Sequence, residues 1–308
     1  MRNYEFFLQL KYMTKKKLAI LIFGGIRTNN NQFNIFKEGL QQYLLTDENK
    51  NDYEINFFLG VDNSIGEDLN FSENIKSIIE IDKETTDNSK NFGIDFNLLE
   101  NKNTKYYQDR INNLEKHHIY GLAPPRFAHT LRRYYKLYRC YLSLVEYEKK
   151  KNIKHDFIAS VRPDAIFLNN ISLKQIFNEF ELAVSWDHFF IGKYDIMEHL
   201  CKIIFDYGKY NMGEIIHKNV DKIINDDHIP GCNYYTYKNI KENRWLCWSE
   251  SPEVQTTEHL FDFIYKNNID MTKINSNILR KCIWFQSKYD STQTKKEIEE
   301  NLKKYVNG

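Results

Sequence analysis

Two glycines, an arginine and a threonine follow the first long apolar run of the chain, and together they suit an anionic ligand. The run covers residues 18–23, and Gly24, Gly25, Arg27 and Thr28 come directly after it. Glycine has no side chain, so a ligand can approach its backbone closely, and the start of a following helix offers unpaired N–H groups. The guanidinium group of arginine can form two parallel hydrogen bonds to a diphosphate. The segment predicts a diphosphate-binding loop. The alternative is a tight turn with a solvated arginine, because the spacing is not that of a glycine-rich dinucleotide motif.

Asp187 and His188 form a second candidate site. They follow a short apolar run at 182–185 and stand between Trp186 and Phe189. Apolar surroundings raise the pKa of a carboxyl group and suit it to act as a general base. We predict Asp187 as a general base, with His188 as the second candidate. The alternative is an aspartate that caps a helix or forms an ion pair beside packed aromatic rings.

Three cations share one stripe of a long helical pattern. Arg132, Lys136 and Arg139 recur at spacings of four and three, so a helix projects them in one direction. They can neutralise an anion if this helix borders the site. The alternative is a solvated helix face.

The elements that must position these residues alternate between strand and helix patterns. The run at 18–23 is apolar throughout and that at 54–61 is mostly apolar, as in buried parallel strands, and an amphipathic helix pattern at 32–45 joins them. This order predicts a right-handed βαβ unit. One further short strand is expected at 77–81.

The second half of the chain continues this alternation. We expect a helix at 128–150, a strand at 156–168, a short strand at 182–185 and a helix at 195–207. Pro163 interrupts the second of these, and because proline cannot donate to a sheet ladder, the break marks a strand end or bulge. Further helices are expected at 105–116, 254–266 and 295–305. In the long helix at 128–150, the side chains expected to face the core are Leu131, Tyr135, Tyr138, Leu142 and Val145.

Composition restricts the function classes. The 308 residues fit one domain at 13–308, with residues 1–12 as an N-terminal extension. Lys plus Arg number 43 against 42 Asp plus Glu, so no net field attracts nucleic acid or an anionic membrane. Five scattered cysteines without a CxxC pair indicate a reducing compartment, and no apolar run approaches the length of a membrane span. We therefore expect a cytoplasmic protein.

Four blocks of sequence, in this order, carry a resemblance to a known family. They are LAILIFGGIRT at 18–28, RRYYKLYRCYLSLVEYEKKKNIKHDFIASVRPDAIFL at 132–168, SWDHFFIGKYDIM at 185–197 and SPEVQTTEHLFDFIYKNNI at 251–269. The chain thereby resembles glycosyltransferase-like proteins of viral and bacterial surface-glycan and lipopolysaccharide synthesis. The resemblance implies an α/β fold of the nucleotide-diphospho-sugar transferase type (type A glycosyltransferase), with a twisted, mainly parallel sheet flanked by helices.

The resemblance also gives a role to Arg162, Pro163 and Asp164. Type A enzymes carry an Asp-x-Asp motif at the end of a central strand, and its carboxylates hold a divalent ion. Asp164 matches the second acid, and Arg162 replaces the first. The resemblance therefore leaves open whether Asp164 binds manganese or magnesium, or whether Arg162 supplies positive charge itself. The alternative is a structural Arg–Asp pair at a strand end.

The function implied is transfer of a sugar from a nucleotide-sugar donor to a glycan hydroxyl, with inversion weakly preferred. The nucleotide would bind within 13–170 and the acceptor within 171–308, where Asp187 would take the acceptor proton. Two rivals stay open: a nucleotide or phosphosugar hydrolase, and a catalytically silent sugar-binding module, which the incomplete acidic motif favours.

Several other polar and aromatic residues receive structural interpretations. Asp226, Asp227 and His228 read as a loop, because adjacent residues seldom converge on one metal ion. Glu253 favours the start of a helix. Aromatic residues of the C-terminal part are assigned to the core: Tyr234, Tyr235, Trp245 and Trp248.

Overall fold

The structure is a computed structural model. It describes residues 15–26, 30–63, 66–81, 124–185, 189–206, 256, 259–260, 262–264, 266–275, 277–280 and 282–285. Among these residues, no helix has the length and apolar character needed to cross a membrane. The expected N-terminal extension at 1–12 and the expected helices at 105–116 and 295–305 lie outside the described residues.

Strand β1 (Lys16–Gly25) lies inside the main sheet because its central residues are apolar on both faces. Residues 18–22 are fully buried. The strand pairs in parallel with β2 (Tyr53–Asp62) on one side and with β4 (Phe157–Val161) on the other. The predicted strands at 18–23 and 54–61 and their parallel βαβ arrangement are confirmed.

The main sheet has seven strands within the described residues, in the order β3-β2-β1-β4-β7-β6-β8. Besides β1, β2 and β4, the sheet contains β3 (Ile75–Glu80) and β8 (Ile274–Asn275) at its edges, and β6 (Leu182–Ser185) and β7 (Phe189–Lys193) between β4 and β8. Strand β7 runs antiparallel to β4 and β6, and the other pairings are parallel. The expectation of a mainly parallel sheet is confirmed.

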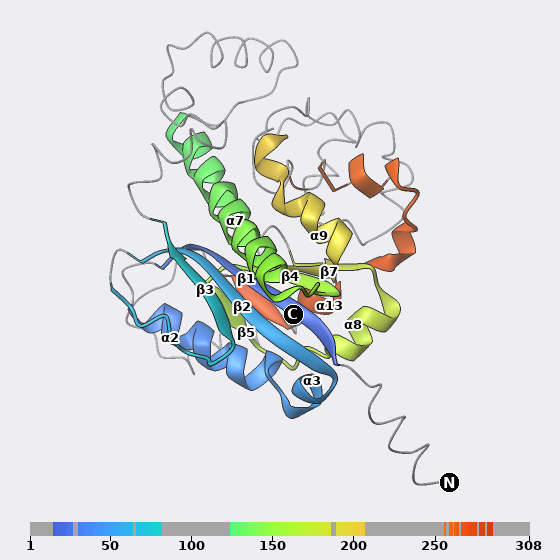
Figure 1. The fold of residues 1–308 in the computed structure, drawn as a ribbon, viewed down its shortest axis with the longest axis horizontal. Helices are drawn as coiled ribbons and strands as arrows, with labels where there is room; N and C mark the ends of the chain where they lie inside the picture. The colour runs from blue at the N-terminus through green and yellow to red at the C-terminus, as the bar shows by residue number, and fades with distance from the viewer. Residues whose placement is uncertain are drawn as a thin grey trace, which may run out of the picture.

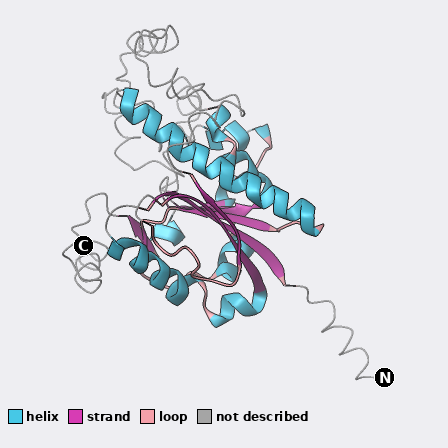
Figure 2. Ribbon diagram, turned by 60° about the vertical axis from the view of Figure 1, so that its left-hand side comes forward, coloured by secondary structure: helices cyan, strands magenta, loops and turns pink. Residues whose placement is uncertain are grey.

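Helices cover both faces of the sheet, which gives three layers (Figures 1 and 2). Figure 2 shows α7 (Pro124–Lys151) along one face. Its apolar side chains share a core with α9 (Tyr194–Cys201) and η2 (Ile203–Phe205). The opposite core gathers side chains of α2 (Asn30–Gly39), η1 (Leu40–Leu44), α8 (Leu173–Glu179) and α13 (Asn277–Arg280). This α/β architecture is compatible with a Rossmann-like fold.

Two short connections complete the described chain. Helix α3 (Asp47–Asp52) precedes β2, and the η3 turn (Met271–Lys273) precedes β8. The buried amide of Asn49 ties α3 to α8, because it donates to the carbonyl oxygen of Ile171 at 2.7 Å and accepts from the N–H of Leu173 at 3.1 Å.

Pro163 divides the predicted strand at 156–168 into two strands of different sheets. Strand β4 ends at Val161, and β5 (Ala165–Phe167) pairs antiparallel with β9 (Ile283–Phe285) in a separate two-stranded sheet. Proline stands in the turn between them because it has no N–H to donate to either ladder. The chain therefore leaves the main sheet at the Arg-Pro-Asp triplet.

The buried stripe of α7 differs from the predicted one. Tyr135 is buried as expected, but Tyr138, Leu142 and Val145 are only half-buried. The fully buried positions are Tyr134, Tyr135, Leu137, Cys140, Tyr141 and Leu144. The helix packs on the sheet along one flank and on α9 and η2 along the other, so its buried stripe is wider than one apolar row and shifted by one residue.

Candidate functional site

The carboxyl ends of β1 and β4 lie at a topological switch point. From β1 the chain moves outward to β2 and β3, and then returns through α7 to place β4 on the other side of β1. Ligands of open α/β sheets bind in the crevice outside the carboxyl ends of the strands where the order reverses in this way. The residues at the ends of β1, β2 and β4 are therefore the candidate site.

Gly24 and Pro163 bring the glycine loop after β1 close to the Arg162-Pro163-Asp164 turn. A methyl group added to Gly24 would lie 3.4 Å from Cδ of Pro163, so the ring of Pro163 faces Gly24 at the end of β1. Gly24 has φ of +130°, which non-glycine residues rarely adopt. The end of β1 and the Arg-Pro-Asp turn therefore lie next to each other. Arg27 and Thr28 lie outside the described residues.

Arg162 and Asp164 form a two-point ion pair across Pro163. Nε of Arg162 donates to Oδ1 of Asp164 at 2.7 Å, and Nη2 binds Oδ2. The Arg162 side chain is 18% exposed and that of Asp164 is 9% exposed. A guanidinium group and a carboxylate match in this forked geometry. The pair fixes the direction of Arg162 at the end of β4.

Lys136 of α7 forms an ion pair with Asp62 at the end of β2. The distance from Nζ to Oδ2 is 3.5 Å. Burial lowers the pKa of Lys136, Asp62 raises it in part and the charge of Arg132 lowers it further, so the net pKa is below the ordinary value for lysine. Lys136 is therefore a partly desolvated cation, and an anion that reaches it meets little competing hydration.

Gly60 explains how α7 comes so close to β2. A methyl group added to Gly60 would lie 2.8 Å from the carbonyl oxygen of Lys136 and 3.0 Å from Cβ of Cys140. Only glycine permits this approach without a shift of the helix. The close crossing places Lys136 opposite Asp62, two residues further along β2.

The predicted cationic stripe divides into two parts. Arg132 lies near enough to Lys136 to lower its pKa. Arg139 instead donates from Nη1 to the hydroxyl oxygen of Tyr135 at 2.9 Å. Arg132 and Lys136 are thus the two members of the stripe that we associate with the site.

Asp187 and His188 lie outside the described residues, but the strands on either side of them are described. Strand β6 ends at Ser185, and β7 begins at Phe189, which pairs with Val161 directly before Arg162. The chain therefore leaves and re-enters the sheet at the same edge as the Arg162–Asp164 pair. The segments of Asp226 to His228, Glu253 and the aromatic residues at 234–248 also lie outside the described residues.

Two cavities lie away from this edge. The larger, about 770 Å³, is lined by Lys15, Lys17 and Lys50 with residues of the amino ends of β1 and β2. The smaller, about 440 Å³, lies between α8 and α13. Both combine apolar walls with exposed polar side chains, and neither includes a predicted site residue.

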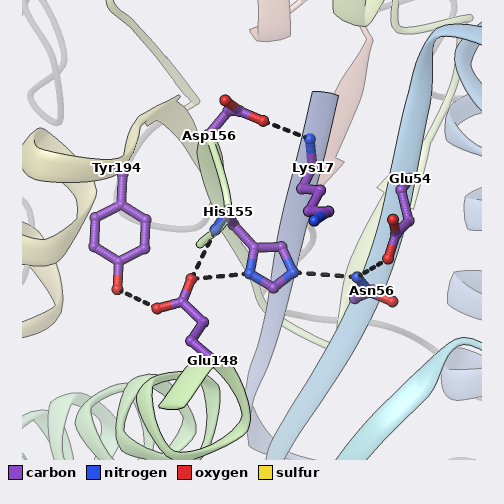
Figure 3. A network of polar contacts seen from close by, with 7 residues as sticks. All are labelled: Lys17, Glu54, Asn56, Glu148, His155, Asp156 and Tyr194. Atoms are coloured by element: carbon purple, nitrogen blue, oxygen red, sulfur yellow. Dashed lines mark hydrogen bonds and ion pairs between the residues drawn. The ribbon is translucent and has the colours of Figure 1, made fainter. Parts of the chain in front are cut away.

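A buried polar network at the amino ends of the strands ties α7 to the sheet (Figure 3). Glu148 of α7 accepts three hydrogen bonds: from the backbone N–H of His155 at 2.8 Å, from its Nδ1 at 2.9 Å, and from the hydroxyl group of Tyr194 at 2.8 Å. Nδ2 of Asn56 on β2 contacts Nε2 of His155 at 3.1 Å. Because an amide NH₂ only donates, Nε2 of His155 accepts this hydrogen bond and Nδ1 donates to Glu148.

The charge of Glu148 is stabilised by its partners. Burial raises the pKa of Glu148, but the hydrogen bonds from His155 and Tyr194 outweigh burial and bring the net pKa below the ordinary value. The network therefore anchors the C-terminal end of α7 against β2 and β4. We assign it a structural role that fixes the helix carrying Lys136.

Lys136 was predicted from the sequence, but its partner Asp62 is the part of the site that the sequence analysis missed. Asp62 follows directly after the buried run of β2, and its register partner on β1 is Gly25. The sequence signal that could have identified Asp62 is an acidic residue at the end of a buried strand, next to a glycine at the end of the neighbouring strand.

No protein-family model matches the sequence, and no curated protein matches it significantly. The fold and the site define the class as an α/β protein with a mainly parallel sheet, in which a glycine turn, a buried Arg–Asp pair and a partly buried lysine meet at the switch point.

Proposed function

We propose that the protein is a glycosyltransferase of the type A fold, which moves a sugar from a nucleotide-activated donor to a glycan hydroxyl. One observation carries the proposal: Gly24 at the end of β1 faces Pro163 of the Arg162-Pro163-Asp164 turn at the end of β4, at the switch point of the sheet. Nucleotides bind at such switch points in α/β sheets.

The leaving group in this reaction is a nucleoside diphosphate, whose negative charge grows as the bond to the sugar breaks. Two of the described cations at this edge, Arg162 and Lys136, are largely buried. Fixed cations in a partly desolvated site stabilise such developing charge more strongly than solvated ones. We assign both to the diphosphate, together with Arg132, Arg27, Thr28 and the backbone of Gly24 and Gly25.

The acceptor hydroxyl needs a base. Its oxygen attacks the anomeric carbon of the donor, the bond from that carbon to the diphosphate breaks, and the hydroxyl proton passes to the base. Asp187 remains our candidate, with His188 second, because β6 ends and β7 begins at the edge of the sheet where β4 ends. A single displacement of this kind inverts the anomeric centre.

One observation favours a second candidate, a sugar-binding module without turnover. Both oxygens of Asp164 bind Arg162, so this carboxylate is committed to a pair within the protein. A module of this kind binds nucleotide sugars or glycans and converts neither.

A thermal-shift screen of nucleotide sugars tests the binding step. A ligand selective for the native state raises the melting temperature, and at about 100 times its Kd it adds about 2.7 kcal/mol of stability. We expect Lys136→Met to reduce affinity by about tenfold or more. The matched control is Lys149→Met, because Lys149 lies on an exposed part of the same helix. A stabilising nucleotide sugar that both variants bind equally well contradicts the assignment.

Product analysis with the nucleotide sugar that binds separates the functions. A glycosyltransferase releases nucleoside diphosphate in amounts that match the glycosylated acceptor, and Asp187→Ala lowers this rate by about 10²-fold to 10⁴-fold with binding intact. A hydrolase releases free sugar without any glycan. A binding module gives no product with any acceptor tested.

A further inference from the structure

Asp164, the acid that would hold a divalent ion in a type A enzyme, is engaged at both oxygens by one guanidinium group. Oδ1 accepts from Nε of Arg162 at 2.7 Å, and Oδ2 binds Nη2 of the same side chain. Both side chains are largely buried, so water has little access to this ion pair. A metal ion at Asp164 would have to compete with the guanidinium group of Arg162 for both carboxylate oxygens, and would bring a second positive charge next to a largely buried one.

The second acid at this edge is also paired with a cation. Asp62 lies 3.5 Å from Nζ of Lys136, whose side chain is 14% exposed. Magnesium and manganese prefer several oxygen ligands, with one or two carboxylates available to the ion. Within the part of the chain that the structure describes, no three His, Cys, Asp or Glu side chains come together as a metal site. The donor set at the ends of β2 and β4 therefore does not fit a divalent ion.

We infer that this site takes a nucleoside diphosphate without a divalent ion, and that Arg162 and Lys136 provide the charge that a metal provides elsewhere. The inference rests on the proposed function. Asp164 is then a positioning residue. Its two carboxylate oxygens hold the guanidinium group of Arg162 at the end of β4, next to Pro163, which faces Gly24. Asp62 does the same for Lys136.

A titration with manganese alone tests the metal part without any nucleotide. Electron paramagnetic resonance measures free Mn²⁺ as the protein is added. We expect the wild-type protein and Asp164→Asn to bind Mn²⁺ equally weakly. Arg162→Asp removes the cation and creates two acids at a spacing of two, so we expect it to bind Mn²⁺ at least about tenfold more tightly than the wild type. Stoichiometric Mn²⁺ on the wild-type protein that is lost in Asp164→Asn overturns the inference. If either variant does not fold, wild-type Mn²⁺ binding that UDP or GDP strengthens overturns it equally.

A nucleotide titration separates this inference from the proposed function. Isothermal titration of the wild-type protein with UDP and with GDP is run in EDTA and in Mn²⁺. We expect the Kd of the nucleotide that binds to agree within about twofold between the two conditions, and Asp164→Asn to weaken binding equally in both. Binding seen only with Mn²⁺ overturns metal independence and leaves the proposed function standing. No binding in either condition counts against the proposed function, and the manganese titration still decides whether Asp164 holds an ion.

Discussion

Gly24 faces the ring of Pro163, although 139 positions separate the two residues in the sequence: a methyl group on Gly24 would lie in van der Waals contact with Cδ of Pro163, at 3.4 Å. This close approach joins the ends of two neighbouring parallel strands, β1 and β4. It brings the glycine turn and the Arg-Pro-Asp turn to one edge of the sheet. Every role that we assign to Arg162 depends on this close approach.

Gly24→Ala should destabilise the protein because alanine rarely adopts φ of +130°. We expect a loss of about 1 to 3 kcal/mol in the free energy of unfolding, measured by urea denaturation. Gly25→Ala is the matched control. A methyl group there meets nothing within 4 Å, so its effect should stay within about 1 kcal/mol and favour stability. Equal losses in both variants would contradict the geometry of the turn.

Gly60→Ala should push α7 away from β2. Its methyl group would overlap the carbonyl oxygen of Lys136 at 2.8 Å, and a helix backbone yields only by a shift of the whole helix. We expect a cost of about 1 to 3 kcal/mol in stability and weaker nucleotide binding, because Lys136 moves away from Asp62. The measurement is nucleotide Kd in the folded variant. Unchanged affinity would show that the position of Lys136 does not matter for binding.

Asp164→Ala should cost far more stability than Asp62→Ala. Removal of Asp164 breaks a largely buried, two-point ion pair, at a cost of about 3 kcal/mol or more. Asp62 is 39% exposed, so its removal should cost about 1 kcal/mol or less. Urea denaturation of both variants measures the difference. Equal costs would mean that the two ion pairs are equally solvated.

Stability should fall in mild acid because of two stacked histidines. The rings of His199 and His259 lie 3.9 Å apart, and each Nε2 donates to the backbone carbonyl oxygen of the other residue. Burial and then the charge of His199 lower the pKa of His259 to about 4, although Asp206 and Asp262 raise it in part. Burial also lowers the pKa of His199, which Lys266 lowers further.

Because these pKa values are lower in the folded protein, the unfolded chain binds protons first as the pH falls below about 6.5. The contribution of His259 to stability is complete above pH 6.5 and is lost progressively toward pH 4. We expect a loss of roughly 1 to 3 kcal/mol between pH 7 and pH 4.5, at about 1.4 kcal/mol per pKa unit. His259→Gln keeps an N–H donor and does not titrate, so its urea midpoint should vary less with pH. Parallel curves for the two proteins would exclude this source.

The strands β1 and β2 and the βαβ unit that they form could be predicted from the sequence, because the strands carry local signals. Residues 18–22 and the run of β2 are apolar on both faces, which only a buried parallel strand requires. Pro163 likewise marked the end of β4 correctly. Strand β7 was not predicted, because the short run from Phe189 has no turn chemistry that distinguishes a strand from a packed loop.

Contacts between side chains that are far apart in the sequence could not be predicted. Asp62 and Lys136 are 74 residues apart, and their contact depends on Gly60, which shows its importance only once α7 is seen to cross it. The core stripe of α7 was predicted one position off, because tyrosines on several sides of the helix blur the 3.6-residue pattern. The partnership of Arg162 with Asp164 was foreseen as the alternative to a metal site.

Hydrogen exchange with and without a saturating nucleoside diphosphate tests the central claim most directly, because it reports where the ligand binds. We predict slower exchange in peptides that cover residues 22–26 and 160–165, at the ends of β1 and β4, and no change around residues 15–17 and 50–54 at the larger cavity. Protection confined to the amino ends of the strands, with none at the Arg-Pro-Asp turn, would contradict the account.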